Sequence, residues 1–67
     1  MKTLQPHQQR VVAELDELKT RTLALGVFLQ STTFQGLDSR EQFRLERQWE
    51  LMQQLGQILS ERIETFA

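Results

Sequence analysis

Two arginines in the C-terminal half of the chain have a spacing that suits the binding of an anion. On a helical wheel at about 100° per residue, Arg44 and Arg62 share one angle and lie about five turns, or roughly 27 Å, apart. Leu51 and Leu55 flank that angle. A guanidinium binds a phosphate or carboxylate through two parallel hydrogen bonds. The pattern indicates either an anion or a partner's carboxylate at this face, or arginines that extend their stems over apolar surface with their heads in water.

The N-terminal half carries a weaker version of this pattern. Arg10 and Arg21 lie eleven residues apart, about three turns, on the flank of an apolar seam, and His7 lies near the seam itself. Glu14 and Glu17 fall on nearly the same flank. Ordinary surface ion pairs between neighbouring turns therefore account for much of this pattern, and spacing alone predicts solvent-exposed arginines.

The sequence does not favour catalysis. It contains one histidine, no cysteine and no tyrosine, and it has no glycine-rich phosphate loop. No acidic residue is predicted to be buried where it could act as a general acid or base. His7, beside Pro6, is read as structural, and no set of metal ligands is present. We therefore expect a protein that is not an enzyme and uses no metal or cofactor.

The first predicted element is a helix over residues 6–30. Its apolar positions recur at alternating spacings of four and three, which places them on one stripe. Pro6 suits the first turn of a helix, and Gly26 permits a bend or a close helix contact. The stripe consists of Val11, Leu15, Leu18, Thr22, Leu25 and Leu29.

A connector and a second helix complete the predicted fold. Residues 31–37 lack a helical stripe, and Phe34 and Leu37 are expected to hold this connector down. Asp38 is a suitable N-cap, and Glu41 completes an aspartate version of the capping box, so the second helix should cover residues 38–65. The expected fold is all-α: a single domain over residues 1–67, arranged as an antiparallel helical hairpin.

The small size of the chain predicts self-association. A core within 67 residues barely offsets the entropy of folding, and neither disulfides nor a metal can help. On a helical wheel with Phe43 at zero, the apolar arc of the second helix runs from about 60° to about 240°. One helical partner covers a narrower stripe than this, unless the first helix crosses the second obliquely. We therefore expect a homo-oligomer. The arc consists of Leu45, Trp49, Leu51, Met52, Leu55, Ile58, Leu59, Ile63 and Phe66.

Charge and hydropathy restrict the partners and the location. Eight Lys and Arg residues against nine Asp and Glu residues give a net charge of -1, which argues against polymeric nucleic acid. A nucleic-acid-binding role for Arg40, Arg44 and Arg47 is therefore the weakest alternative. The longest apolar run, Leu23 to Leu29, is far shorter than a membrane span, and no export signal is evident. A cytoplasmic protein without membrane contact is expected.

Several short residue patterns, spread from about Leu4 to Phe66, together resemble those of a known family. Their order and spacing are similar to those in the helical hairpin domain of phage anti-CBASS and anti-Thoeris sponge proteins. The patterns are the runs Pro6–Val12, Phe28–Ser31, Glu41–Leu45 and Ile58–Ile63, together with Phe34, Leu37, Gln48 and Met52.

The resemblance implies function by sequestration. Such proteins assemble, typically as hexamers, and trap cyclic oligonucleotide signals of bacterial defence in the host cytoplasm without cleaving them. The expected ligands are cyclic di- and trinucleotides, with cyclic ADP-ribose variants as a further class. The family's phosphate-binding arginines fall on Arg10, Arg44 and Arg62, and a further basic position falls near Arg21. Phe34 offers an aromatic wall, and His7 stands where relatives often carry an aromatic that stacks on a base.

A different class of function remains open on the residues alone. The excess apolar face suits a non-catalytic helical oligomerisation or adaptor module that binds a partner protein. Arg44 and Arg62 would then meet carboxylates of the partner.

Overall fold

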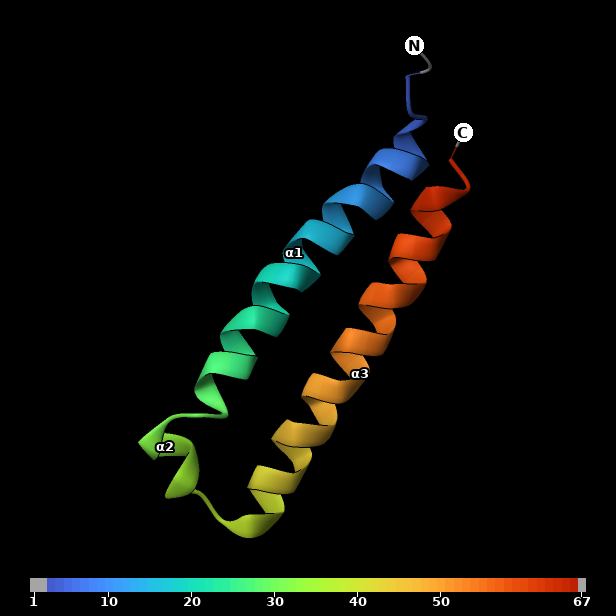
Figure 1. The fold of residues 1–67 in the computed structure, drawn as a ribbon. Helices are drawn as coiled ribbons and strands as arrows, with labels where there is room; N and C mark the ends of the chain where they lie inside the picture. The colour runs from blue at the N-terminus through green and yellow to red at the C-terminus, as the bar shows by residue number, and fades with distance from the viewer. Residues whose placement is uncertain (1–2, 67) are drawn as a thin grey trace.

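The computed structural model describes residues 3–66, which form a helical hairpin. Its elements are α1 (Pro6–Phe28), the single turn α2 (Thr32–Gln35) and α3 (Ser39–Glu64). Figure 1 shows α1 and α3 side by side and antiparallel, with both chain ends at the same end of a rod that measures 51 × 15 × 14 Å. The all-α class and the pairing of two long helices are confirmed.

Local side-chain contacts fix where the long helices begin. Pro6 occupies the first turn of α1, and the backbone N–H of Gln5 donates to Oε1 of Gln8 at 2.9 Å. Asp38 is the N-cap of α3, as expected, because its carboxylate accepts from the N–H of Arg40 at 3.3 Å. The Glu41 side chain has a different role from the predicted one: it binds Arg44.

The connector contains a helical turn that the sequence did not predict. α1 ends at Phe28, two residues before the expected boundary. The hydroxyl of Ser31 explains the break, since it donates to the carbonyl of Phe28 at 2.6 Å and accepts from the N–H of Phe34 at 3.1 Å. Ser31 thereby ends one helix and caps α2. The side chain of Gln42 then ties the connector to α3 by donating to the carbonyl of Phe34 at 2.9 Å.

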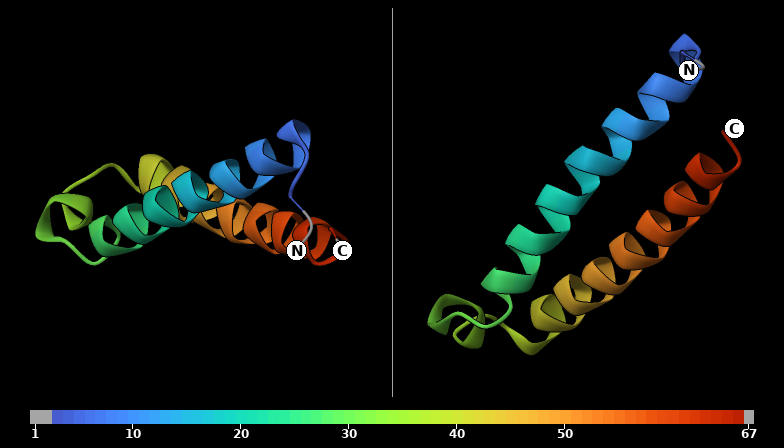
Figure 2. Two further views of the ribbon diagram at one scale, coloured as in Figure 1. Left: turned by 90° about the horizontal axis from the view of Figure 1, so that it is seen from above. Right: turned by 45° about the horizontal axis from the view of Figure 1, so that its top comes forward.

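The buried core is small and lies at two levels. Val11, Leu15 and Leu59 pack together near the chain ends, and Leu59 is only 2% exposed. Phe34 fills the other end, with its ring edge-on to Phe28 at a centroid distance of 6.2 Å. Figure 2 shows from above that α1 crosses α3 obliquely. The crossing does not cover all of the predicted apolar arc.

Two helical glycines permit the close approach of α1 and α3, and they should respond differently to alanine. A Cβ on Gly56 would lie 3.7 Å from Cδ2 of Leu18, an ordinary contact, so Gly56→Ala should stabilise the chain by up to about 1 kcal/mol through helix propensity. A Cβ on Gly26 would lie 3.0 Å from Nε1 of Trp49, so the ring must move and the gain should be smaller or absent.

Urea unfolding followed by circular dichroism, at one protein concentration for both variants, measures this difference. A Gly26→Ala variant that gains as much stability as Gly56→Ala would contradict the tight packing of Trp49 against α1.

Candidate functional site

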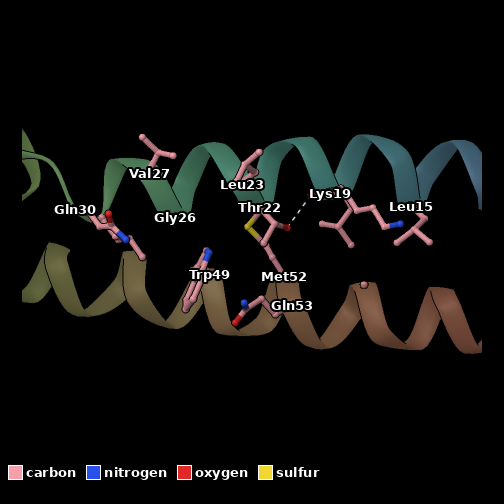
Figure 3. A pocket seen from close by; sticks show the side chains of 13 residues that line it. Leu15, Lys19, Thr22, Leu23, Gly26, Val27, Gln30, Trp49, Met52 and Gln53 are labelled. Carbon is pink, nitrogen blue, oxygen red and sulfur yellow. Dashed lines mark hydrogen bonds between the residues drawn. The ribbon is translucent and has the colours of Figure 1, made fainter.

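One face of the hairpin carries an apolar groove between α1 and α3. The groove has a volume of about 720 Å³, and in Figure 3 Trp49 and Met52 point from α3 toward α1. Among residues 3–66, Lys19 is the only charged residue that lines it. The groove is therefore suited to an apolar side chain or ligand rather than to an anion. Its lining consists of Leu15, Leu18, Lys19, Thr22, Leu23, Gly26, Val27, Leu29, Gln30, Trp49, Met52, Gln53 and Gly56.

The four arginines that the sequence singles out share the opposite face. On α1, Arg21 lies about 160° around the helix from Leu23, which lines the groove. On α3, Arg44 lies about 140° from Trp49, on the flank away from the groove. None of the four lines the groove. We call this surface the arginine face; it carries Arg10, Arg21, Arg44 and Arg62.

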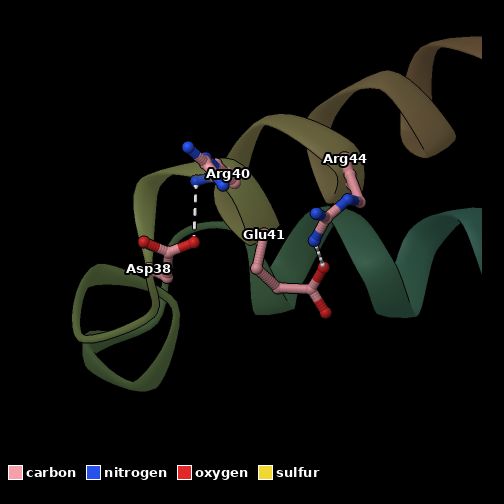
Figure 4. A network of polar contacts seen from close by, with 4 residues as sticks. All are labelled: Asp38, Arg40, Glu41 and Arg44. Atoms are coloured by element: carbon pink, nitrogen blue, oxygen red, sulfur yellow. Dashed lines mark hydrogen bonds and ion pairs between the residues drawn. The ribbon is translucent and has the colours of Figure 1, made fainter.

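Arg44 lies at the connector end of the arginine face, over apolar surface. A shallow hollow of about 400 Å³ is lined by Arg44, Leu51 and Leu55 together with Arg47, Gln48 and Met52. Nη1 of Arg44 lies 3.1 Å from Oε1 of Glu41, as Figure 4 shows, and the two side chains are 66% and 49% exposed. Exposed ion pairs of this kind contribute little free energy. Arg44 therefore keeps guanidinium donors for a ligand.

Arg10 and Arg62 lie at similar levels near the other end. Gly26 lies against Trp49, and Gly56 lies against Leu18. This antiparallel register puts Arg10 within about one turn of the level of Arg62. Both side chains are exposed, and among residues 3–66 neither guanidinium has a carboxylate within 4.0 Å. Two exposed guanidinium groups therefore lie at similar levels toward the end of the rod opposite the connector.

The remaining predicted site residues have different surroundings. Arg21 lies midway along the rod, with Nη2 3.9 Å from Oε2 of Glu17. His7 is exposed in the first turn of α1, near Arg10. Phe34 is only 8% exposed and packs on Phe28, so its ring has a structural role in the connector and is not an open stacking wall in the hairpin.

The arrangement does not form one complete pocket within a single hairpin. Arg44 and Arg62 are roughly 27 Å apart along α3, more than a small cyclic nucleotide spans. The groove, in contrast, was not foreseen as a site. The available signal was the pair of glycines, since glycine on a helix face permits the close approach of a neighbouring helix.

Other kinds of site find no support in the described part of the chain. No group of three or more His, Cys, Asp or Glu residues within residues 3–66 is arranged to hold a metal ion. Over the same residues, neither long helix has an apolar stretch that would cross a lipid bilayer. The arginine face and the groove are therefore the two surfaces that require an explanation.

Comparison with known proteins identifies the family. The model of the Sequestin family matches residues 5–65, from the N-cap of α1 to the C-cap of α3. No curated protein and no solved structure gives a significant match. The family's name describes sequestration, which is consistent with the class of activity expected from the sequence. The match spans the whole hairpin, and the chain belongs to the Sequestin family.

Proposed function

We propose that this protein is a phage-type anti-defence sponge that binds cyclic di- or trinucleotides and withholds them from CBASS or Thoeris signalling without cleaving them. Cyclic ADP-ribose variants are a further class of ligand. The observation that carries the proposal is the arginine face, where Arg10, Arg44 and Arg62 are exposed around apolar surface. Membership of a family named for sequestration supports the same class of activity.

The chemistry of the face matches that of the ligand. A cyclic di- or trinucleotide presents two or three phosphates, which guanidinium groups bind through charge-assisted paired hydrogen bonds. Its flat bases need apolar walls, which Leu51 and Leu55 offer beside Arg44. Tight binding with slow release suffices for sequestration, so no catalytic group is needed. The protein would act in the host bacterial cytoplasm as a homo-oligomer, with a hexamer favoured.

A calorimetric titration panel tests the proposal. The panel contains cyclic di-AMP, cyclic di-GMP, cyclic tri-AMP and a cyclic ADP-ribose isomer, with duplex DNA as the polymeric control. We expect a Kd below about 1 μM for at least one cyclic nucleotide and weak, salt-sensitive binding of the duplex. Mass spectrometry after heat release should recover the ligand intact. Binding of none of the cyclic compounds, or recovery of linear products, would refute the proposal.

The groove favours a second candidate function. Its apolar lining, with Leu23 70% and Val27 65% exposed at its edge, suits a helix or apolar segment of a partner protein, as in an adaptor module. The same panel separates the two functions, because an adaptor leaves every titration silent. An adaptor that uses the groove would lose partner capture when Leu23 is substituted, whereas one whose partner meets Arg44 and Arg62 with carboxylates would lose it when those arginines are substituted.

A further inference from the structure

The groove between α1 and α3 has no role in the proposed binding of nucleotides, although its size is that of a ligand site. Its volume of about 720 Å³ falls within the roughly 300–1,000 Å³ of small-molecule sites. A standard protein interface takes about 20–30 residues from each partner, whereas 13 residues in the described part of the chain line the groove. The groove therefore fits a small ligand better than it fits a folded partner.

The middle of the groove offers apolar walls and few free polar groups. Trp49 and Met52 point from α3 toward α1 (Figure 3), and an indole ring and a thioether both pack well against methylene groups. Thr22 lines the groove as well, but its hydroxyl already donates to the carbonyl of Leu18 at 2.7 Å. A chain that carries no polar groups along its length can therefore lie there without leaving a hydrogen bond unsatisfied.

A single positive charge without an ion-pair partner borders this apolar surface. Among residues 3–66, Lys19 is the only charged residue that lines the groove, and no carboxylate of those residues lies within 4.0 Å of its ammonium group. The residues four positions before and after it, Leu15 and Leu23, are apolar and also line the groove, so α1 supplies no partner at that spacing. The charge of Lys19 is therefore complementary to an anionic group on a ligand that is otherwise apolar.

The length of the groove restricts the length of such a ligand. The Lys19 side chain extends toward Leu15 in Figure 3, away from Gln30 at the connector end. Gln30 follows Lys19 by eleven residues, which corresponds to roughly 16 Å along a helix axis. An extended chain advances about 1.2 Å per bond, so about 13 bonds cover this distance. A carboxylate with an unbranched chain of about twelve carbons therefore reaches from Lys19 to Gln30.

We infer that the groove binds a medium-chain fatty acid, with its carboxylate at the ammonium group of Lys19 and its alkyl chain along Trp49 toward Gln30. Such a site takes a carboxylate rather than a phosphate, lies on the face opposite the arginine face, and is complete in one hairpin. It therefore goes beyond the proposed function and does not depend on the binding of a cyclic nucleotide.

Intrinsic fluorescence tests the inference, because Trp49 is the only tryptophan of the chain and lines the groove. The full chain is titrated with dodecanoate, hexanoate and dodecyltrimethylammonium, each below its micelle-forming concentration. We expect dodecanoate to change the Trp49 emission saturably. Hexanoate should bind at least about tenfold more weakly because it buries less apolar surface. The cationic amphiphile should bind at least about threefold more weakly because Lys19 does not attract its head group.

Matched variants separate the effect of the charge from that of the apolar walls. Lys19→Gln should weaken dodecanoate binding roughly three- to fivefold and abolish the preference over the cationic amphiphile. Arg40→Gln removes a positive charge outside the groove and should change neither by more than about twofold. Leu23→Asp places a carboxylate at the groove and should weaken dodecanoate binding at least about tenfold. Ala24→Asp, at the exposed neighbouring position outside the groove, should stay within about twofold of the parent chain.

Circular dichroism verifies that the variants keep their helical content. The absence of a saturable change with dodecanoate, or equal affinities for dodecanoate and hexanoate, would overturn the inference. So would a Lys19→Gln chain that still prefers the anionic amphiphile. A Trp49 emission that changes with protein concentration but not with dodecanoate would identify a second copy as the occupant of the groove, and the fatty-acid site would then be wrong.

Discussion

The Arg44→Ala and Arg62→Ala variants are each expected to bind a cyclic nucleotide roughly 10- to 100-fold more weakly than the parent chain. The loss corresponds to about 1.5–3 kcal/mol, the usual contribution of a hydrogen bond to a charged group. Both positions carry exposed guanidinium groups on the arginine face, so each variant should lose affinity although the two are roughly 27 Å apart in one hairpin. Calorimetry with the cyclic nucleotide that binds best measures both losses.

Two further variants control for charge and for folding. Lys19→Ala removes a positive charge from the groove face and should leave the affinity within about twofold of the parent, because Lys19 lies away from the arginine face. Arg62→Lys keeps the charge but loses the planar paired donors, so it should recover only part of the lost affinity. Equal losses for Lys19→Ala and Arg62→Ala would show that net charge, not the arginine face, governs binding.

Leu59→Ala is expected to have the largest effect on stability. Leu59 is 2% exposed and packs against Val11 and Leu15 in the small core. Truncation of a buried leucine costs about 2–5 kcal/mol, and a single core of this size rarely supplies more than about 3–5 kcal/mol. The variant should therefore be largely unfolded at room temperature, which the helical signal at 222 nm in circular dichroism would report.

The matched control is Leu23→Ala, because Leu23 is 70% exposed. It removes the same atoms from the same kind of helix and should change the free energy of unfolding by less than about 0.5 kcal/mol. A folded Leu59→Ala chain with a normal urea midpoint would mean that assembly, rather than the core of one hairpin, provides most of the stability.

The helical architecture could be predicted from sequence because helical periodicity and capping are local. The seam through Val11 and Leu15 and the N-cap at Asp38 each depend on residues within a few positions. The shared angle of Arg44 and Arg62 follows from the same periodicity, so their common flank was available before the structure. Self-association of the hairpin and its binding of a cyclic nucleotide stay predictions.

The connector shows where local reasoning was insufficient. Residues 31–37 carry no apolar stripe, but a single turn such as α2 needs only the hydroxyl of Ser31 as its cap. Two roles are predicted for Phe34, a hold on the connector and an aromatic wall, and the folded chain confirms the first because the buried ring packs on Phe28. The ring packs on Phe28 of α1, across the break at Ser31, and helical periodicity does not extend across such a break.

The sequence by itself determined two amphipathic helices, the N-cap of the second at Asp38, and the angle of each arginine on its own helix. Only the tertiary structure decided which flanks of the two helices share a face. The antiparallel register, held by Trp49 against Gly26 and by Leu18 against Gly56, brings Arg10 level with Arg62 and puts the arginines opposite the groove. The physical reason is that periodicity fixes rotation about one axis, whereas the alignment of two axes depends on contacts between residues far apart in the chain.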